Sequence, residues 1–350
     1  MKAVIKASER PFDLVIKEIP LRERKMGEVL VKIQMVSICG SDLHMYAGHS
    51  GYNWIKYPRV LGHEMTGVVA EADDQTLVGK RVVINPYIPC GKCEHCINGE
   101  ENLCDYGTFH IEKKAPKSLQ YGFRRDGGMA EYIIVPEQNV LLVPDGISDE
   151  VAAISEALAV GLTAVEKVKG IEKKSVVIFG PGPIGLGIAS ILKGLGVPKI
   201  VIVGVPGDEE RLETAKEIGV DDVVITSDQL VDDLLQISNG YHVMFDSSGH
   251  ASVPEKAAHL LKKGGDLVLV GISTNRFTLR MDQIVRGEIN IRGSYGITRK
   301  SYEKLLQYAS KPEFPFKKLV QFVYSYEESR KAFEKALNKG KGKVVLKFDK

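Results

Sequence analysis

At 350 residues, 44% of them hydrophobic, the chain is long enough for about two domains, each with a core of its own. Its 47 lysine and arginine residues nearly balance its 45 aspartate and glutamate residues, so it lacks the charge excess typical of proteins that bind nucleic acid or anionic membranes. No apolar run approaches the roughly 20 residues that span a bilayer, and the opening MKAVIKASER lacks the apolar core of a signal peptide. We therefore expect a soluble cytoplasmic protein whose partner is a small molecule, with no nucleic acid and no membrane involved.

Short strands separated by glycine turns dominate the chain from residue 1 to about 155. The opening MKAVIKA and the run EVLVKIQMVSI at 28–38 both predict strands. The run DGGMAEYIIVP at 126–136 predicts a turn that leads into another strand. This pattern indicates a domain of the β-barrel type.

A cysteine with several polar neighbours follows the strand at 28–38. The group comprises Cys39, Ser41, Asp42 and His44 in SICGSDLH, and His63 and Glu64 in LGHEMTG. A lone cysteine at a strand end is more often an inert, small apolar residue than a ligand. A catalytic zinc ion, however, takes three protein ligands of mixed nitrogen, sulfur and oxygen type and keeps a fourth position exchangeable, and Cys39, His63 and one carboxylate meet that requirement. Asp42 can then hold the second ring nitrogen of His63.

The other four cysteines stand together in PCGKCEHCINGEENLC, at 89–104. They are Cys90, Cys93, Cys96 and Cys104, with the spacing C-x2-C-x2-C-x7-C. A disulfide framework is disfavoured in a reducing compartment, and an odd total of five cysteines fits it poorly. The common bacterial iron–sulfur run has a shorter last interval and a following proline, whereas Asp105 follows here. We therefore expect four thiolates around one structural zinc ion with no open position, and His95 as a bystander.

These motifs, in this order and at these separations, resemble the zinc-dependent medium-chain alcohol dehydrogenases, and the resemblance covers essentially the whole chain. The sorbitol and threonine dehydrogenase subgroup is the most similar, because ISEALAVGLTAV places Glu156 where that subgroup has a glutamate instead of a second cysteine. The resemblance implies an α/β fold, with a GroES-like β-barrel catalytic domain, a Rossmann doubly wound parallel-sheet coenzyme domain and an active site in the cleft between them. It also implies two zinc ions per chain, one catalytic and one structural.

The resemblance assigns the catalytic zinc ion to Cys39, His63 and either Glu64 or Glu156, because members of the subgroup differ over which glutamate binds directly. Taken alone, Glu156 would be an ordinary acidic residue in the first turn of a helix. Ser41 would accept the proton of the substrate hydroxyl and pass it through the coenzyme ribose to His44. Glu64 and Glu156 would let the metal or its water shift during turnover. Surface or capping roles are expected for His110, His242, His250 and His259.

The run KKSVVIFGPGPIGLGIASILKGLGV at 173–197 combines an apolar strand, a glycine turn and a helical pattern. A G-x-G-x-x-G motif alone is weak, but Gly180, Gly182 and Gly185 lie where a strand gives way to a helix, which is the setting that pyrophosphate binding needs. Further strands are predicted at 199–205, 222–226, 242–249 and 266–272, and helices at 208–219, 229–238 and 252–264. Such alternation is typical of a parallel sheet with both faces covered.

The residues after the second strand of this part bear on the choice of coenzyme. An acidic residue about 20 positions beyond the first glycines normally binds the ribose 2′-hydroxyl, but GVP stands there, at 204–206. Asp208 can reach the ribose if the loop is longer than usual, and Arg211 can instead help to hold a 2′-phosphate. We favour NAD over NADP because the acidic run at 208–210 would repel that phosphate. The expected coenzyme contacts are Gly180, Gly182, Pro183, Ile184, Gly185, Val205, Asp208, Arg211 and Gly271.

These patterns define three parts of the chain. We expect the catalytic domain at 1–155 with its structural zinc lobe at 86–106, the coenzyme domain at 156–291, and a C-terminal return to the catalytic domain at 292–350, which ends in the strand KVVLKF.

One departure from the subgroup concerns the residue that binds the substrate. The sorbitol and threonine enzymes carry a substrate-binding arginine just after a G-x-[FY] step, whereas this chain has Gly296 and Ile297 there, and Arg299 is the nearest candidate.

The reaction implied is the reversible oxidation of a secondary alcohol on a polyol, sugar acid or hydroxy amino acid, with hydride transfer to a nicotinamide coenzyme. The reverse direction would take the corresponding carbonyl compound. One alternative is a zinc-free, quinone-reductase-like enzyme, and another is a non-catalytic nucleotide-binding protein that kept the same fold. Both are disfavoured because all the expected metal ligands are present. By analogy with the family we expect a homo-oligomer, a tetramer or a dimer.

Overall fold

The computed structural model describes residues 1–106, 120–338 and 340–348, and the chain divides into two compact units. Unit 1 comprises Met1–Ala157, Ile297–Ser310 and Val320–Lys350, and unit 2 comprises Leu158–Gly296 and Lys311–Leu319. The C-terminal part of the chain thus contributes two segments to unit 1, separated by a short segment that packs with unit 2.

Unit 1 is built mainly from strands. Its elements are β1 (Lys2–Lys6), β2 (Leu14–Glu18), β3 (Glu28–Ser37), α1 (Gly40–Ala47), β4 (Arg59–Val60), β5 (Glu64–Glu71), β6 (Arg81–Ile84), α2 (Glu94–Ile97), β7 (Tyr132–Pro136), β8 (Val140–Leu142), the start of α3 (Asp149–Val165), α10 (Arg299–Ala309), β15 (Val320–Ser325), α11 (Ser329–Leu337) and β16 (Lys343–Lys347). A three-stranded sheet has the order β2-β1-β4, and a seven-stranded sheet has the order β15-β16-β3-β5-β6-β8, with β7 paired to β3.

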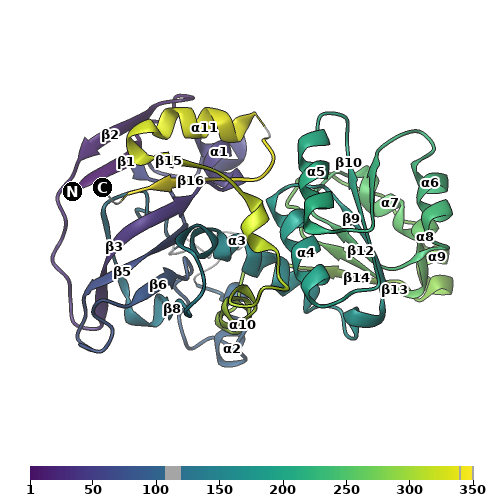
Figure 1. The fold of residues 1–350 in the computed structure, drawn as a ribbon, viewed down its shortest axis with the longest axis horizontal. Coiled ribbons are helices and arrows are strands. Elements are labelled where there is room, and N and C mark those ends of the chain that lie inside the picture. Colours follow the sequence, from purple (N-terminus) through teal and green to yellow (C-terminus); the bar gives the residue numbers. More distant parts are fainter. Residues whose placement is uncertain (107–119, 339, 349–350) are drawn as a thin grey trace. The chain divides into compact units, whose positions relative to one another are not determined.

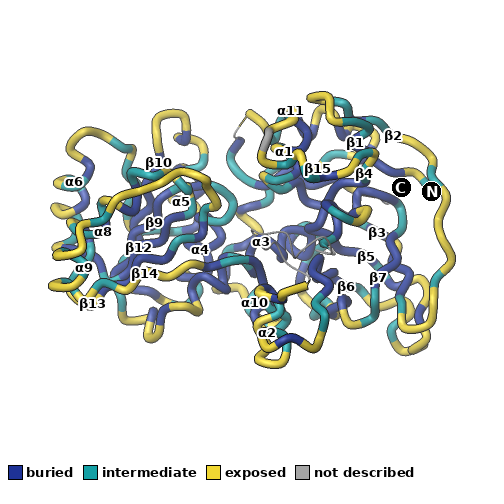
Figure 2. The backbone as a smooth tube through the Cα atoms, turned by 180° about the vertical axis from the view of Figure 1, so that it is seen from behind, coloured by how far each residue is buried: buried dark blue, intermediate teal, exposed yellow. Residues whose placement is uncertain are grey.

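Strand β3 lies at the centre of the larger sheet, because it pairs with β5, β7 and β16. Its first half is buried from Val29 to Val31, and Lys32 is the one exposed residue of the strand. Its second half is buried except for the half-buried Gln34, and the register to β5 shifts between Ile33 and Met35. Figure 2 shows this central part of unit 1 as buried backbone. The C-terminal end of β3 is therefore held firmly from both sides.

Unit 2 alternates strands and helices. Its elements after α3 are β9 (Ser175–Phe179), α4 (Pro183–Gly194), β10 (Lys199–Gly204), α5 (Glu209–Ile218), β11 (Asp222–Ile225), α6 (Leu230–Ile237), β12 (Tyr241–Asp246), α7 (Ser252–Glu255), α8 (Ala257–Leu260), β13 (Leu261–Leu269), α9 (Met281–Gly287) and β14 (Asn290–Gly293). All neighbouring strands are parallel, in the order β11-β10-β9-β12-β13-β14. In chain order within the unit this is 3-2-1-4-5-6, the order of a Rossmann sheet.

Helices cover both faces of the parallel sheet, with α4 and α5 on one face and α6 to α9 on the other (Figure 1). All five residues of β9 are buried, as a central strand between two helical layers must be. The predicted doubly wound parallel sheet is therefore confirmed. Its strand order reverses between β9 and β12, and the carboxyl ends of strands at such a point form the usual nucleotide site of this fold.

One predicted helix was wrong in extent. The helix expected at 252–264 is two short helices, and the chain enters β13 already at Leu261. Leu261 pairs with Tyr241 of β12, so a long-range strand contact takes these residues out of the helix. No helix in the described ranges is both long enough and apolar enough to cross a membrane.

Candidate active site

Cys39 lies between the end of β3 and the first residue of α1. Its backbone is extended, and its N–H donates to Asp42 Oδ2 at 3.0 Å, so that Asp42 caps the start of the helix. Helix α1 ends at Gly48, whose positive φ of 73° is the left-handed conformation in which helices commonly end. These local signals fix the position of the Cys39 thiol at the end of a buried strand.

His63 and Glu64 reach the same place because β5 runs antiparallel to β3. Glu64, the first residue of β5, pairs in register with Ser37, the last residue of β3. The sulfur of Cys39, a ring nitrogen of His63 and a carboxylate oxygen of Glu64 consequently lie within 4.8 Å of one another. The structure thus brings together three of the four residues expected at the catalytic zinc ion.

Asp42 joins the two segments that carry these ligands. Besides the N–H of Cys39, it accepts a hydrogen bond from the N–H of Gly62 at 3.2 Å through Oδ1. The same oxygen lies 3.9 Å from His63 Nδ1. Asp42 is fully buried, and burial raises the pKa of its carboxyl group. At 3.9 Å the contact with His63 is longer than a hydrogen bond, so the orientation of His63 by Asp42 stays a prediction.

A lysine that the sequence did not single out completes the surroundings of Glu64. Lys343 Nζ lies 2.7 Å from Oε1 and 2.6 Å from Oε2 of Glu64, and it also donates to the carbonyl of Ile38 at 2.9 Å. The two strands that carry these side chains, β16 and β5, flank β3, so their side chains meet beyond its end. Burial alone would lower the pKa of Lys343, but the Glu64 carboxylate outweighs it and raises the pKa. Lys343 therefore keeps its positive charge although it is buried.

Glu156, the alternative ligand, lies on α3 outside the group of three. It is 4% exposed and makes no hydrogen bond to any described residue. Burial raises the pKa of Glu156 to about 7, and the nearby His63 opposes this shift. Its neighbour Ser155 is hydrogen-bonded to Tyr302 on α10, with 2.9 Å between the hydroxyl oxygens. Glu156 is thus a buried carboxylate within electrostatic reach of His63 and without a committed partner.

The two residues of the expected proton relay both lie on α1. Ser41 Oγ is buried and has no hydrogen-bond partner in the described part of the chain. His44 is exposed, and its Nδ1 lies 2.7 Å from Nδ1 of His49. Partial burial lowers the pKa of His44, and the second imidazole lowers it further. His44 therefore stays neutral close to pH 7, as a proton acceptor must.

A row of aromatic side chains, formed by Phe123, Trp54 and Tyr52, adjoins His63. The Phe123 ring lies 4.9 Å from the His63 ring, and the Trp54 ring lies nearly parallel to that of Phe123, at 6.2 Å with an angle of 11° between their planes. The Tyr52 ring is 6.4 Å from that of Trp54 and 5.7 Å from that of His44. These contacts were not predicted, because single aromatic residues in loops carry no distinctive pattern.

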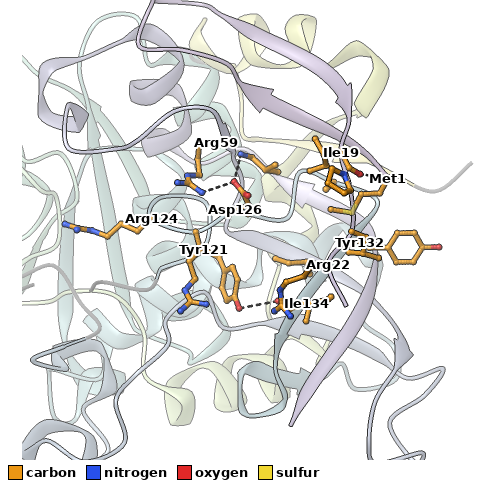
Figure 3. A pocket seen from close by; sticks show the side chains of 16 residues that line it. Met1, Ile19, Arg22, Arg59, Tyr121, Arg124, Asp126, Tyr132 and Ile134 are labelled. Atoms are coloured by element: carbon orange, nitrogen blue, oxygen red, sulfur yellow. Dashed lines mark hydrogen bonds and ion pairs between the residues drawn. The ribbon is translucent and has the colours of Figure 1, made fainter. Parts of the chain in front are cut away.

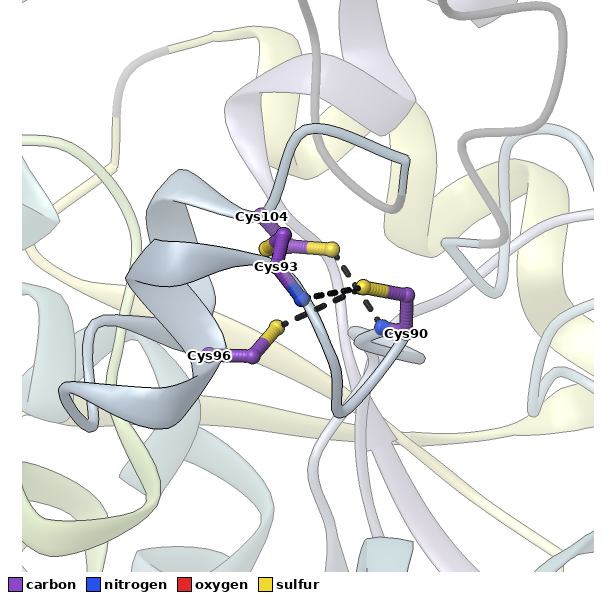
Figure 4. A group of neighbouring side chains, drawn as sticks. All are labelled: Cys90, Cys93, Cys96 and Cys104. Atoms are coloured by element: carbon purple, nitrogen blue, oxygen red, sulfur yellow. Dashed lines mark hydrogen bonds between the residues drawn. The ribbon is translucent and has the colours of Figure 1, made fainter.

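The four cysteines of the lobe converge as expected (Figure 4). Their sulfur atoms lie within 4.8 Å of one another, and none of the cysteines forms a disulfide. The 3.9 Å between the sulfurs of Cys90 and Cys96 is close to the edge of a tetrahedron with zinc–sulfur bonds of about 2.3 Å, which is roughly 3.8 Å. The backbone N–H groups of Lys92 and Cys93 point at Cys90 Sγ and lower the pKa of that thiol to about 6.

Both clusters fit the metal ions that the sequence implied. In the lobe, the thiol with the lowered pKa is a ready thiolate ligand. In the other cluster, sulfur, nitrogen and oxygen donors lie within 4.8 Å of one another, and burial raises the pKa of the Cys39 thiol, which a bound cation would reverse. His95 bonds Glu100 at 3.0 Å and not a cysteine, in keeping with its expected bystander role. His110 lies outside the described residues.

The glycine turn of unit 2 follows β9, at the point where the strand order reverses. Gly182 caps α4 and Pro183 is the first residue of that helix. Gly180 has a φ of 95°, and a Cβ at Gly185 would lie 1.9 Å from the carbonyl oxygen of Gly180. A Cβ at Gly182 would meet nothing within 4 Å. The first and third glycines thus serve the turn and close packing, and the second leaves open space before the helix N-terminus.

The remaining residues expected at the coenzyme follow β10 and β13, two other strands of the same parallel sheet. Val205 follows β10 and is exposed, and Gly271 lies after β13, where a Cβ would meet the backbone nitrogen of Gly249 at 2.3 Å. Asp208 is turned inward: its Oδ2 accepts from the N–H of Val205 at 3.1 Å, and Oδ1 lies 3.9 Å from Nη1 of Arg211. The carboxylate of Asp208 therefore orders the loop after β10.

Arg299, the candidate substrate arginine, is engaged elsewhere in unit 1. It donates to the carbonyl of Gln138 at 2.6 Å and forms an ion pair of 2.8 Å with Glu303 one helical turn later. These contacts tie the start of α10 to the chain just before β8. The structure gives Arg299 a structural role there.

Comparison with known proteins agrees with this architecture. The family model of the alcohol dehydrogenase GroES-like domain matches residues 25–145, and that of the zinc-binding dehydrogenase matches residues 183–311. A sorbitol dehydrogenase from Bacillus subtilis is 32% identical over 347 residues, which cover 96% of this chain and 94% of the relative. An alcohol dehydrogenase from Escherichia coli, solved with NADH, has a TM-score of 0.89 at 29% identity, with 99% of both chains covered. L-idonate 5-dehydrogenase from the same species has a TM-score of 0.85 at 30% identity and covers 99% of this chain and 97% of its own.

Proposed function

The chain belongs to the zinc-dependent medium-chain alcohol dehydrogenase family, and from this premise we propose that it reversibly oxidises a secondary alcohol of a polyol, sugar acid or similar metabolite. The buried group of Cys39, His63 and Glu64 carries the proposal, because it offers sulfur, nitrogen and oxygen donors within 4.8 Å. The names of two relatives, sorbitol dehydrogenase and L-idonate 5-dehydrogenase, point to the same substrate classes. A nicotinamide coenzyme would accept the hydride.

We place the catalytic zinc ion on Cys39, His63 and Glu64. A zinc ion held there would supply Lewis-acid chemistry and lower the pKa of a substrate hydroxyl. Lys343 holds the Glu64 carboxyl group in place, and Asp42 holds the Cys39 and His63 segments together. Glu156 is the second carboxylate of the site, buried and free of hydrogen bonds to described residues. The four cysteines of the lobe would hold the structural zinc ion.

The proton of the substrate hydroxyl would leave through α1. Ser41 Oγ is a buried hydroxyl without a partner among the described residues, so it is available to bond the substrate hydroxyl. His44 lies one helical turn further on, is exposed, and has a lowered pKa, so it can take a proton and release it to solvent. The geometry of α1 supports a route of this kind from the site to the surface.

For the coenzyme we propose NAD, bound at the glycine turn of 180–185. Gly182 leaves space in front of the α4 N-terminus, where a pyrophosphate gains from the helix dipole. The first turn of α5 carries Glu209 and Glu210 beside Asp208, and Arg211 lies next to Asp208. This negative charge disfavours the 2′-phosphate of NADP. The E. coli relative was solved with NADH.

The test combines metal content with coenzyme reduction. We expect two zinc ions per purified chain, and reduction of NAD in preference to NADP with a panel of polyols, aldonic acids and threonine. Cys39→Ser should leave one zinc ion, native coenzyme binding and no turnover. Between the two glutamates, Glu64→Gln should lose the catalytic zinc ion, whereas Glu156→Gln should keep it. Wild-type turnover in Cys39→Ser would overturn the proposal, and zinc loss only in Glu156→Gln would transfer the ligand role to Glu156.

A further inference from the structure

Arg124 packs on Trp54, and the Phe123 ring lies between Trp54 and His63 of the candidate metal centre. The guanidinium carbon of Arg124 is 4.7 Å from the ring centroid of Trp54, a cation–π contact. Its Nε is buried and has no hydrogen-bond acceptor, and no carboxylate in residues 1–106, 120–338 and 340–348 forms an ion pair with it. A buried N–H donor without an acceptor is costly, so the position of this side chain calls for an explanation.

The side chains around Arg124 connect it to a proposed metal ligand. Phe123, its neighbour in sequence, packs against His63 and lies alongside Trp54. Trp54 is itself fixed, because its Nε1–H donates to the carbonyl of Gly51 at 3.1 Å. Arg124 therefore rests on an aromatic platform that is one ring removed from the side chain covering His63. All of these residues belong to unit 1.

The acidic side chain that lines the cavity near Arg124 pairs with a different arginine. Arg124 lies at the edge of this cavity of about 440 Å³, which is also lined by Arg22, Arg59, Arg125 and Asp126. Asp126 is engaged by Arg59 at 2.9 Å, and Arg22 is engaged by Glu28 at 2.6 Å. Figure 3 shows the Arg124 side chain extending away from Arg59, Asp126 and Arg22. The acid in this cavity is thus used by another arginine, and the charge of Arg124 is not compensated there.

We propose that Arg124 binds an oxyanion of the substrate, a phosphate ester or a carboxylate remote from the hydroxyl that is oxidised. This inference rests on the proposed function and narrows its substrate class to polyol phosphates and sugar acids. The planar guanidinium matches either oxyanion with paired hydrogen bonds, and the Trp54 ring keeps it oriented before the substrate arrives. Arg299, the residue that the sequence suggested for such a role, is committed to Gln138 and Glu303.

Tryptophan fluorescence can follow binding at this site directly, because Trp54 is the single tryptophan of the chain. Intrinsic tryptophan fluorescence at constant ionic strength would follow titrations with inorganic phosphate, sorbitol, sorbitol 6-phosphate and gluconate, with zinc present and no turnover required. We expect a saturable change with sorbitol 6-phosphate or gluconate and none with sorbitol. A response to the phosphate ester alone would assign the site to polyol phosphates, and a response to gluconate alone would assign it to sugar acids.

Arg125 provides the matched control, since Arg125→Gln removes the same charge from the next, exposed residue. Arg124→Gln should weaken binding of the anion tenfold or more, the loss expected for a charged hydrogen bond, whereas Arg125→Gln should retain it. Arg124→Lys, which keeps the charge without the planar fork, should fall between the two. In turnover, Arg124→Gln should raise the KM for the anionic substrate far more than it lowers kcat.

Two outcomes would overturn the inference: equal binding of sorbitol and its phosphate by the wild type, or equal losses in Arg124→Gln and Arg125→Gln. Its failure is distinguishable from failure of the proposed function. If anions change the fluorescence of a protein that reduces no coenzyme with any alcohol, the anion site is supported and the proposed dehydrogenase activity is rejected. If neutral polyols are turned over normally and anions cause no fluorescence response, the dehydrogenase activity is supported and the anion site is rejected.

Discussion

Replacing Lys343 by methionine tests the buried ion pair at the centre of the site. Glu64 is 0% exposed and Lys343 is 3% exposed, so the substitution leaves a carboxylate in the interior without its counter-charge. Removal of one partner from a buried pair costs about 3–5 kcal/mol. For a unit of this size that free energy corresponds to a fall in melting temperature on the order of 10 °C. Methionine has a similar length, so packing changes little.

The loss should depend on zinc. A divalent cation beside Glu64 would compensate the charge that Lys343 no longer balances, so Lys343→Met should destabilise the zinc-free protein more than the zinc-loaded one. Thermal unfolding of both forms, followed by circular dichroism, measures the difference. Lys347→Met is the matched control, because this lysine lies on the same strand and is exposed. Its effect should stay within about 0.5 kcal/mol.

A double variant separates the ion pair from other consequences of the substitution. Glu64→Gln with Lys343→Met leaves neither charge in the interior, so it should regain most of the stability lost in Lys343→Met alone. The reasoning would be refuted if Lys343→Met lowered the free energy of unfolding of the zinc-free protein by less than about 1 kcal/mol. It would also be refuted if the loss of stability in the double variant equalled the sum of the losses in the two single variants.

Three further predictions concern other parts of the molecule. Cys93→Ser should release the zinc ion of the lobe and lower the melting temperature while the second zinc ion stays, and loss of both ions by elemental analysis would contradict separate sites. Gly185→Ala places a Cβ 1.9 Å from the carbonyl oxygen of Gly180, so it should cost about 1–3 kcal/mol and weaken NADH binding in a fluorescence titration; unchanged affinity would argue against the turn as the coenzyme site. In His49→Asn, the pKa of His44 should rise, because one cause of its lowering is gone, and the acidic limb of kcat/KM for alcohol oxidation should move to higher pH; an unmoved limb would exclude His44 as the proton acceptor.

The features that could be predicted from the amino-acid sequence are those that depend on short-range chemistry. The four cysteines of the lobe span 15 residues, so a loop can bring them together whatever the rest of the fold does. The turn of 180–185 likewise depends on a strand, three glycines and a helix that are adjacent in the chain, and the structure has each of them in that order. Alternating strands and helices then leave the parallel sheet as the arrangement that covers both faces.

Cys39 and His63 are an intermediate case. They lie 24 residues apart, yet motif residues around each of them indicated the pairing. The antiparallel register of β3 and β5, with Ser37 opposite Glu64, explains the contact. The choice between Glu64 and Glu156 could not be made from the sequence, because it depends on where α3 places Glu156 relative to the ends of those two strands.

Only the tertiary structure revealed Lys343, Arg124 and the extent of β13. Lys343 lies 279 residues from Glu64, and a lysine at the start of an apolar strand carries no sign of burial. Arg124 became notable only because Trp54 and Phe123 fold beside it, and because Asp126 is used by Arg59. Local patterns report what neighbouring residues prefer, whereas the pairing of charges and the stacking of side chains depend on segments that meet only in the folded chain.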